Sequence, residues 1–195
     1  MNIQDHIAKI NWSLGNKLVI VVFGFVNFFQ ISMMDTSSFG LWYIILAINQ
    51  WAMLVSQNFS LQGMIQFGMD KSTRAKADLL SLGLHSFISL LACGLYIIAD
   101  LLIDFDLGDK VGLFIFVLIA SNIFRYFILK FLQREYRYKE YFFVELIYYA
   151  TISAFIFYRF FTTKVIEVEE LVWLFVIAEL ACSILGLLLI AKDMK

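Results

Sequence analysis

The residues best suited to chemistry in this chain are three ionisable side chains inside long apolar runs. Arg125, Glu145 and Glu179 are each flanked by aliphatic and aromatic residues. In a membrane-spanning helix, a central Arg costs about 3 kcal/mol on insertion scales, so such a charge needs a partner or a function. With a rise of 1.5 Å per residue, the depth of Arg125 in the membrane differs by about 7 Å from that of Glu179 and by about 6 Å from that of Glu145. Either carboxylate is therefore a candidate partner for the guanidinium.

Two interpretations of Arg125 are open at this point. It forms a buried ion pair that holds helices together, or it binds an anionic substrate while a carboxylate modulates its charge. The planar fork of a guanidinium suits a pyrophosphate, because it meets two phosphate oxygens at once. Asn122 lies one turn earlier on a similar face. We take Arg125 and Asn122 as candidates for a substrate path, and Glu145 and Glu179 as coupling or ion-pair candidates.

A second polar group lies in the apolar run 41–67. At about 100° per residue, its members share an arc of roughly 140°. They are Asn49, Gln50, Ser56, Gln57, Ser60 and Gly63. Such a face either hydrogen-bonds to a neighbouring helix or lines a cavity. The candidates for the substrate path on this face are Asn49, Gln50, Gln57 and Ser60.

The elements that must position these side chains are membrane-spanning helices. The 195 residues are 62% apolar and 16% charged, with a formal net charge of −1. This excludes a disordered chain, a soluble enzyme and a nucleic-acid binder with a basic surface. Six continuous runs approach or exceed the roughly 20 residues that span a bilayer. They cover 18–34, 41–67, 79–103, 111–132, 142–161 and 171–191. We predict an all-α polytopic membrane protein, a single six-helix lobe over residues 1–195.

The distribution of positive charge predicts the orientation of these helices. Eleven Lys and Arg residues fall in the termini and in the connections on the same side, against three on the other side. Cytoplasmic loops carry the excess of Lys and Arg in membrane proteins. Both termini are therefore expected in the cytoplasm.

Motifs for catalysis or metal binding are weak. The chain has no phosphate-binding loop, dinucleotide fingerprint, zinc-protease helix or nucleophile elbow. Asp104 and Asp106 have the spacing of an Asp-x-Asp metal site, but they fall in an acidic outer connection. Cys93 and Cys182 lie inside apolar runs, which argues against a disulfide framework or a metal cluster. We expect no catalytic residue, metal or cofactor, and a protein that is not an enzyme.

Three short segments resemble one family, the polysaccharide and O-antigen flippases of the multidrug and oligosaccharidyl-lipid exporter superfamily. Residues 34–43, MDTSSFGLWY, are similar to the turn between the first two helices of that family. Residues 61–68 resemble its small-residue stretch before the first cytoplasmic loop, and residues 132–139 resemble its basic connection between helices four and five. Gln62 and Gln66 stand where the family often has an Arg.

The resemblance implies transport of a lipid-linked oligosaccharide, of the polyprenyl pyrophosphate type, across the bacterial cytoplasmic membrane. Transport would proceed by alternating access between two six-helix lobes. The family normally has twelve or more helices, so this chain corresponds to one lobe, and the second lobe would come from a homodimer or a separate chain. Membrane lipids are the other expected partners, and nucleic acid is not one. The alternative is a non-transporting partner or scaffold subunit of a polysaccharide-assembly complex.

Overall fold

The structure is a computed structural model that describes residues 3–191 except 69, 71, 104–106 and 109, and every regular element within these residues is a helix. The elements are α1 (Ile3–Ser32), α2 (Thr36–Ser56), the π-helical turn η1 (Gln57–Leu61), α3 (Gln62–Phe67), α4 (Arg74–Ile103), α5 (Val111–Arg134), α6 (Tyr138–Phe161) and α7 (Val168–Ile190). With α2, η1 and α3 counted as one stretch, the described part has six helices long and apolar enough to cross a membrane. The predicted all-α fold with six membrane-spanning helices is confirmed.

Several helices begin earlier than the apolar runs predicted. α1 begins at Ile3 and α2 at Thr36, whereas the corresponding runs begin at residues 18 and 41. An apolar run marks only the part of a helix that lies in lipid, while polar residues extend and cap the helix outside it. Asp35 caps α2 by accepting a hydrogen bond of 2.8 Å from the backbone nitrogen of Ser38. The hydrogen bonds from Ser38 also lower the pKa of Asp35.

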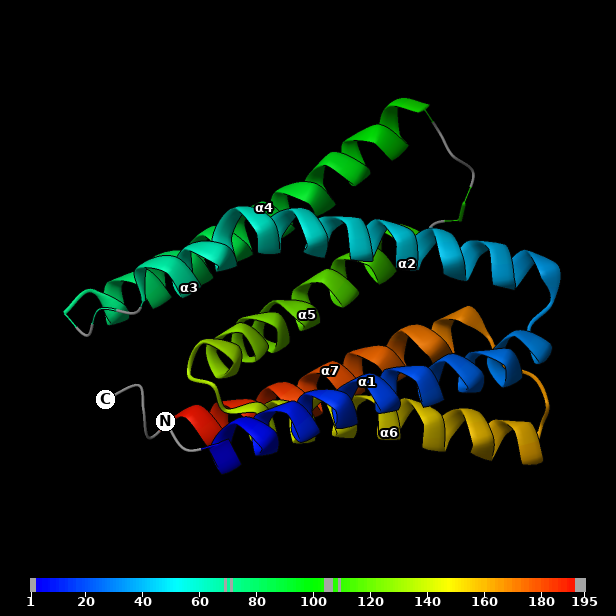
Figure 1. Cartoon of the computed structure of the whole chain (residues 1–195). Coiled ribbons are helices and arrows are strands. Elements are labelled where there is room, and N and C mark those ends of the chain that lie inside the picture. Colours follow the sequence, from blue (N-terminus) through cyan, green and yellow to red (C-terminus); the bar gives the residue numbers. More distant parts are fainter. Residues whose placement is uncertain (1–2, 69, 71, 104–106, 109, 192–195) are drawn as a thin grey trace.

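The helices run back and forth between two ends of the bundle. α1 begins and α7 ends at the end that also holds the α3–α4 and α5–α6 connections (Figure 1). We call this end the base and the opposite end the far end. The connections that follow α1, α4 and α6 all lie at the far end.

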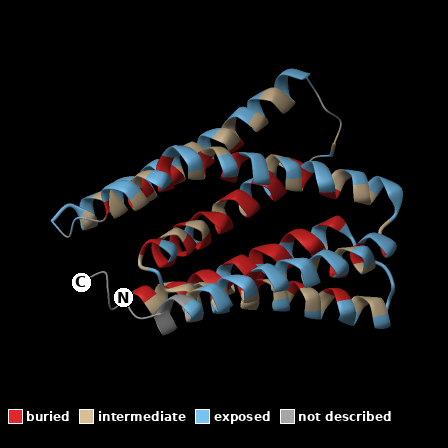
Figure 2. Cartoon of the chain, viewed as in Figure 1, coloured by how far each residue is buried: buried red, intermediate tan, exposed pale blue. Residues whose placement is uncertain are grey.

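α5 lies between two groups of helices. α2 and α4 pack on one side of it, and α7 packs on the other side, against both α5 and α6. α1 completes the second group by packing along α6 (Figure 1). Figure 2 shows buried residues gathered along α5 and α7, whereas α1 and α4 expose most of their surface. Ser121, Asn122 and Arg125 on α5, all buried, are thus held at the centre of the molecule.

Two close contacts fix α7 against its neighbours. A Cβ atom at Gly186 would lie 2.5 Å from the side chain of Ile128, so α5 and α7 approach closely only because residue 186 is glycine. Near the far end, the rings of Trp42 and Phe175 meet edge to face, with centroids 5.0 Å apart. This ring geometry is favourable for aromatic pairs and joins α2 to α7.

Of the polar residues that were expected on one face, Ser56 and Ser60, at and within the π turn η1, are buried, whereas Gln50 is exposed. Ser60 donates to the carbonyl of Ser56 within this turn, and the hydroxyl of Ser56 lies 2.5 Å from His85 Nδ1 on α4. Ser89, also on α4, donates to the Ser56 hydroxyl over 3.0 Å. These contacts join α2 to α4. A π turn has i→i+5 hydrogen bonds and therefore changes the angular position of every residue that follows it.

Candidate functional site

Three helices bring the intramembrane charges together at the centre of the bundle. Arg125 of α5 places its Nη2 atom 2.5 Å from Oε1 of Glu145 on α6. Its Nη1 atom lies 3.0 Å from Oε1 of Glu179 on α7. The three side chains are only 5%, 6% and 1% exposed, in that order. The depth estimate from the sequence left the partner open, and the structure shows that one guanidinium binds both carboxylates.

Aromatic rings enclose the same guanidinium. The Cζ atom of Arg125 lies 3.7 Å from the ring centroid of Tyr148 and 5.4 Å from that of Tyr126. A cation above an aromatic face is stabilised by the ring quadrupole, and more strongly where water is excluded. The arrangement therefore favours a charged Arg125 inside the membrane-spanning region.

The cluster holds more negative than positive charge. With all groups ionised, two carboxylates and one guanidinium give a formal charge of −1. Within the described residues, Oε2 of Glu179 and Oγ of Ser183, one turn later on α7, are buried without a hydrogen-bond partner. Buried charge without compensation is costly. The cluster thus has the capacity to take up one further positive charge, such as a proton.

A pocket of about 210 Å³ lies beside this cluster. Its wall comes from η1, α5 and α6 and consists of Gln57, Arg125, Tyr126, Leu129, Lys130, Gln133, Tyr141, Glu145 and Tyr149. A second pocket of about 150 Å³ shares Gln133 and Tyr141 with the first and adds residues of α1. Polar surface thus continues from Arg125 toward the base. The larger pocket is smaller than the 300–1,000 Å³ of common ligand sites, so it fits one small polar group at a time.

The structure brings together some of the predicted site residues and separates others. Arg125, Glu145 and Gln57 share the larger pocket, and Glu179 lies behind it. The remaining four candidates are not among its lining residues, and they are Asn49, Gln50, Ser60 and Asn122.

Each of those four has its own environment. Asn122 is buried and donates to the carbonyl of Leu118 over 2.8 Å, which is a contact within its own helix. Ser60 is bonded inside the π turn, and Asn49 is buried with no partner for Oδ1 among the described residues. Gln50 is exposed on the outside of α2.

Sequence reasoning missed the tyrosines and Lys130 as part of the pocket. For Lys130, Tyr141 and Tyr149 a signal is present in residues 129–149, which combine four Lys or Arg with eight Tyr or Phe. Periodicity alone does not show that one face of this segment lines a cavity.

The candidate metal site Asp104 and Asp106 lies outside the described residues. Within the described residues, no group of three or more possible metal ligands of the types His, Cys, Asp and Glu occurs.

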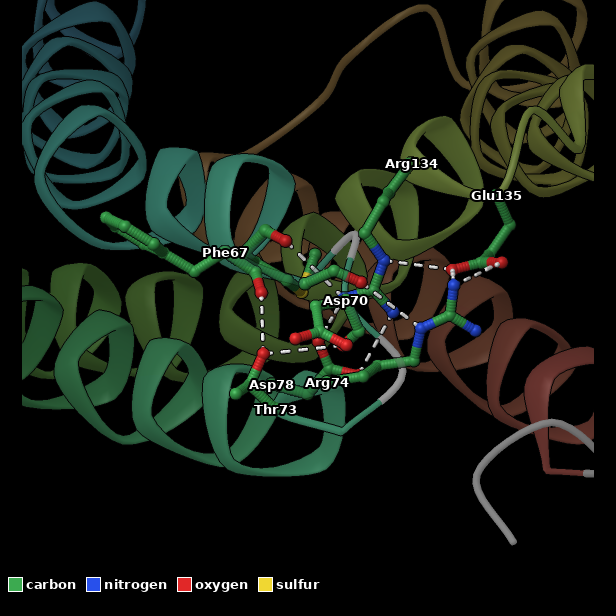
Figure 3. A network of polar contacts seen from close by, with 9 residues as sticks. Phe67, Asp70, Thr73, Arg74, Asp78, Arg134 and Glu135 are labelled. Carbon is green, nitrogen blue, oxygen red and sulfur yellow. Dashed lines mark hydrogen bonds and ion pairs between the residues drawn. The ribbon is translucent and has the colours of Figure 1, made fainter.

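A second network of charged side chains lies at the base of the molecule (Figure 3). The side chain of Arg134 is fully buried and binds both carboxylate oxygens of Asp78 on α4, with Nη2–Oδ2 at 3.0 Å. Its Nε atom lies 2.9 Å from Glu135, which also pairs with Arg74 at 3.0 Å. The sequence presented Arg134 only as a loop cation. In the structure it joins α4 to the end of α5.

The turn before α4 is fixed by short-range contacts in the same view. Asp70 accepts a hydrogen bond of 3.0 Å from the backbone nitrogen of Ser72, and these contacts lower the pKa of Asp70. The hydroxyl of Thr73 lies 3.2 Å from the carbonyl of Phe67.

The chain was also compared with known proteins. No family model, curated protein or solved structure matches it.

Proposed function

We propose that this chain is one lobe of a transporter that moves a lipid-linked oligosaccharide, of the polyprenyl pyrophosphate type, across a bacterial cytoplasmic membrane. The observation that carries the proposal is the pocket beside Arg125, because it brings charged and polar groups into the membrane-spanning part of the bundle. A protein that only anchors or joins other subunits has no need for a polar pocket at this depth. The short segments that resemble flippases give the substrate class.

Lys130 is the cation best placed to meet the substrate first. Its only hydrogen bond in the described part is a long one, 3.5 Å to Gln133, so its ammonium group is available to an anion. Arg125 is different, because both Nη atoms already bind carboxylates. Uptake of a proton by the cluster would weaken one of these ion pairs and free part of the guanidinium for a phosphate oxygen. Tyrosine and glutamine side chains supply hydrogen-bond donors and acceptors for sugar hydroxyls.

The proposed orientation places the base in the cytoplasm. The base carries the excess of Lys and Arg, and the positive-inside rule assigns such an end to the cytoplasmic side. The pockets extend from Arg125 toward this end. In this orientation the described conformation receives substrate from the inner leaflet, where lipid-linked precursors would be loaded.

The test is transport by the purified chain in liposomes, using a fluorescent polyprenyl pyrophosphate oligosaccharide whose exposure is read with an added glycosidase. Lys130→Gln should lower the initial rate about tenfold or more, because a hydrogen bond to a charged group contributes roughly 1.5–3 kcal/mol. Lys139→Gln is the matched control, since Lys139 is an exposed cation near the base outside both pockets. It should transport within twofold of the wild type.

Two results would contradict the proposal. Wild-type protein that transports no faster than empty liposomes would favour the partner-subunit alternative. Equal rates for Lys130→Gln and Lys139→Gln would show that the pocket is not on the substrate path.

A further inference from the structure

A row of amide side chains runs along the outside of the helical stretch formed by α2, η1 and α3. Gln50, Asn58, Gln62 and Gln66 are all exposed, and exposed Leu54 completes their spacing of four residues. None of the four amides forms a hydrogen bond within the described part of the chain. The exposed surfaces of α1 and α4 are different, because large aliphatic and aromatic side chains cover most of their membrane-spanning length.

The π turn keeps this row on one side. On a regular α-helix, residues four apart drift around the axis by about 40° per step, which amounts to roughly 160° from residue 50 to residue 66. The turn Gln57–Leu61 has the wider i→i+5 hydrogen-bond pattern. It therefore rotates less per residue, which offsets part of that drift. Gln62 and Gln66, which follow the turn, therefore lie closer to the line of Gln50 than they would on a regular helix. Asn58, at the start of the turn, lies within about 80° of that line.

Two of these amides lie too deep to face lipid without a partner. Gln50 is at the middle of the 32-residue stretch Thr36–Phe67. Asn58 lies eight residues from it, or about 12 Å along the axis, within the roughly 15 Å half-thickness of the hydrocarbon core. An amide without a hydrogen bond in hydrocarbon costs several kcal/mol. This face must therefore be covered by something that offers both donors and acceptors.

We propose that the face binds the same face of a second copy of this chain, parallel to it, around a two-fold axis normal to the membrane. Each amide carries a donor and an acceptor, so it can pair with its own counterpart at equal depth. Amides are known to join membrane helices in this way. The row carries no charge, so like residues meet without repulsion, and an anionic headgroup finds no cation on it.

The apolar residues beside the row fit the same partner. Trp51 and Phe59 are 57% and 74% exposed and supply contact area next to Gln50 and Asn58. Toward the far end, exposed Gly40 and Ala47 present little bulk, which allows two helices to approach closely. The interface is thus polar at its centre, narrow at one end and flanked by large rings.

Disulfide trapping in native-like bilayers tests this interface. Gln50→Cys and Asn58→Cys should each give a crosslinked dimer after mild oxidation. Leu91→Cys, on the exposed surface of α4 at similar depth, is the matched control and should not. The wild type sets the background, because Cys93 and Cys182 are both buried. Equal or greater crosslinking through Leu91→Cys would overturn the proposal.

A second measurement removes the amides but keeps the surface compatible with lipid. The double variant Gln50→Leu with Asn58→Leu should lower the dimer association constant in bilayers at least tenfold, as measured by single-molecule photobleaching across dilutions. Gln66→Leu should change it less than twofold, because Gln66 lies about 24 Å from Gln50, where water or headgroups can replace its bonds. Thermal unfolding checks that each variant is folded.

Other occupants of the face would give different results. An undiminished association constant in the folded double variant would overturn the proposal. So would rapid modification of Gln50→Cys by a membrane-impermeant maleimide without dimer formation, since the face would then line water. Both experiments measure association alone, so a failure here is distinct from a failure of the transport assay.

Discussion

Two buried arginines on one helix make an informative pair. Arg125 and Arg134 both lie on α5, both side chains are at most 5% exposed, and each contacts two carboxylates. At the base, however, Arg74 adds a second cation, so two guanidiniums meet the two carboxylates of Asp78 and Glu135. At the centre, one guanidinium meets two carboxylates. The base network is balanced in charge and the central cluster is not.

Access to water separates the two clusters further. The carboxylates at the base are 17% and 21% exposed, whereas those at the centre are 6% and 1% exposed. A balanced network at a wet end is what a structural joint between helices requires. An unbalanced cluster of buried side chains is expensive, and the protein keeps it beside a pocket. Local charge balance thus distinguishes the arginine that holds the fold from the one that we assign to function.

The largest expected effect is that of Arg125→Ala. This change leaves two buried carboxylates without a counter-charge and should lower the free energy of unfolding by about 3–5 kcal/mol. Yield of folded protein and thermal unfolding in detergent measure it. Adding Glu145→Gln and Glu179→Gln should restore folded protein but not transport, whereas recovery of transport would end the assignment of Arg125 to substrate handling.

Arg134→Ala should have a smaller effect, a loss of about 1–3 kcal/mol in the free energy of unfolding. Asp78 and Glu135 can still reach water, and Glu135 keeps its contact with Arg74. Transport by the folded fraction should stay near the wild-type rate. The comparison between the two arginines fails if this variant is less stable than Arg125→Ala in the same thermal assay.

Glu179→Gln should leave stability unchanged within about 1 kcal/mol, or raise it, because it removes the excess charge and leaves one ion pair. Asp78→Asn is the matched change at the base and should lower stability, since it leaves two guanidiniums with one carboxylate. Thermal unfolding of the two variants side by side measures the difference. The reverse order would show that charge balance does not distinguish the clusters.

The smallest effect is expected for Lys110→Gln at the far end. Lys110 and Glu169 pair at 2.8 Å, but both are exposed, and the pairing raises the pKa of Lys110. Exposed ion pairs contribute little, because water screens them and ordering two long side chains costs entropy. We expect no resolvable shift in the unfolding temperature at low or high salt. A clear shift at low salt would mean that surface pairs matter here as much as buried ones.

The sequence was sufficient for the number of membrane-spanning helices, and it named the three members of the central cluster without deciding which carboxylate pairs with Arg125. Charges are rare inside apolar runs, so depth along each helix was enough to place Arg125 near Glu145 and Glu179. The same reasoning could not place Arg134, because the apolar run ends at residue 132 and the next cation looks like part of a loop. Its burial depends on Asp78, a residue 56 positions away.

The polar face of the second helix was harder to predict. A regular helix puts Gln50 and Ser56 on one arc, whereas in the structure Ser56 is buried and Gln50 is exposed. Both residues precede the π turn Gln57–Leu61, so the difference comes from helix packing: the two lie about 120° apart around α2, and Ser56 is the one that contacts His85 on α4. The π turn affects only the residues that follow it, and neither the turn nor the contact with His85 is visible in the spacing of residues.

That π turn also governs how this segment tolerates a change in length. In effect it is an α-helix that has taken in one extra residue. Deleting one residue between 57 and 61 would therefore restore a continuous α-helix and leave α3 near its present angle to α2, because four α-helical residues turn the chain about as far as the five residues of the wider turn. Met64 would stay buried, and its carbonyl would stay near Arg134. A one-residue deletion here should therefore be tolerated better than one in the regular part of α2, where it would rotate every later residue of the stretch by about 100°.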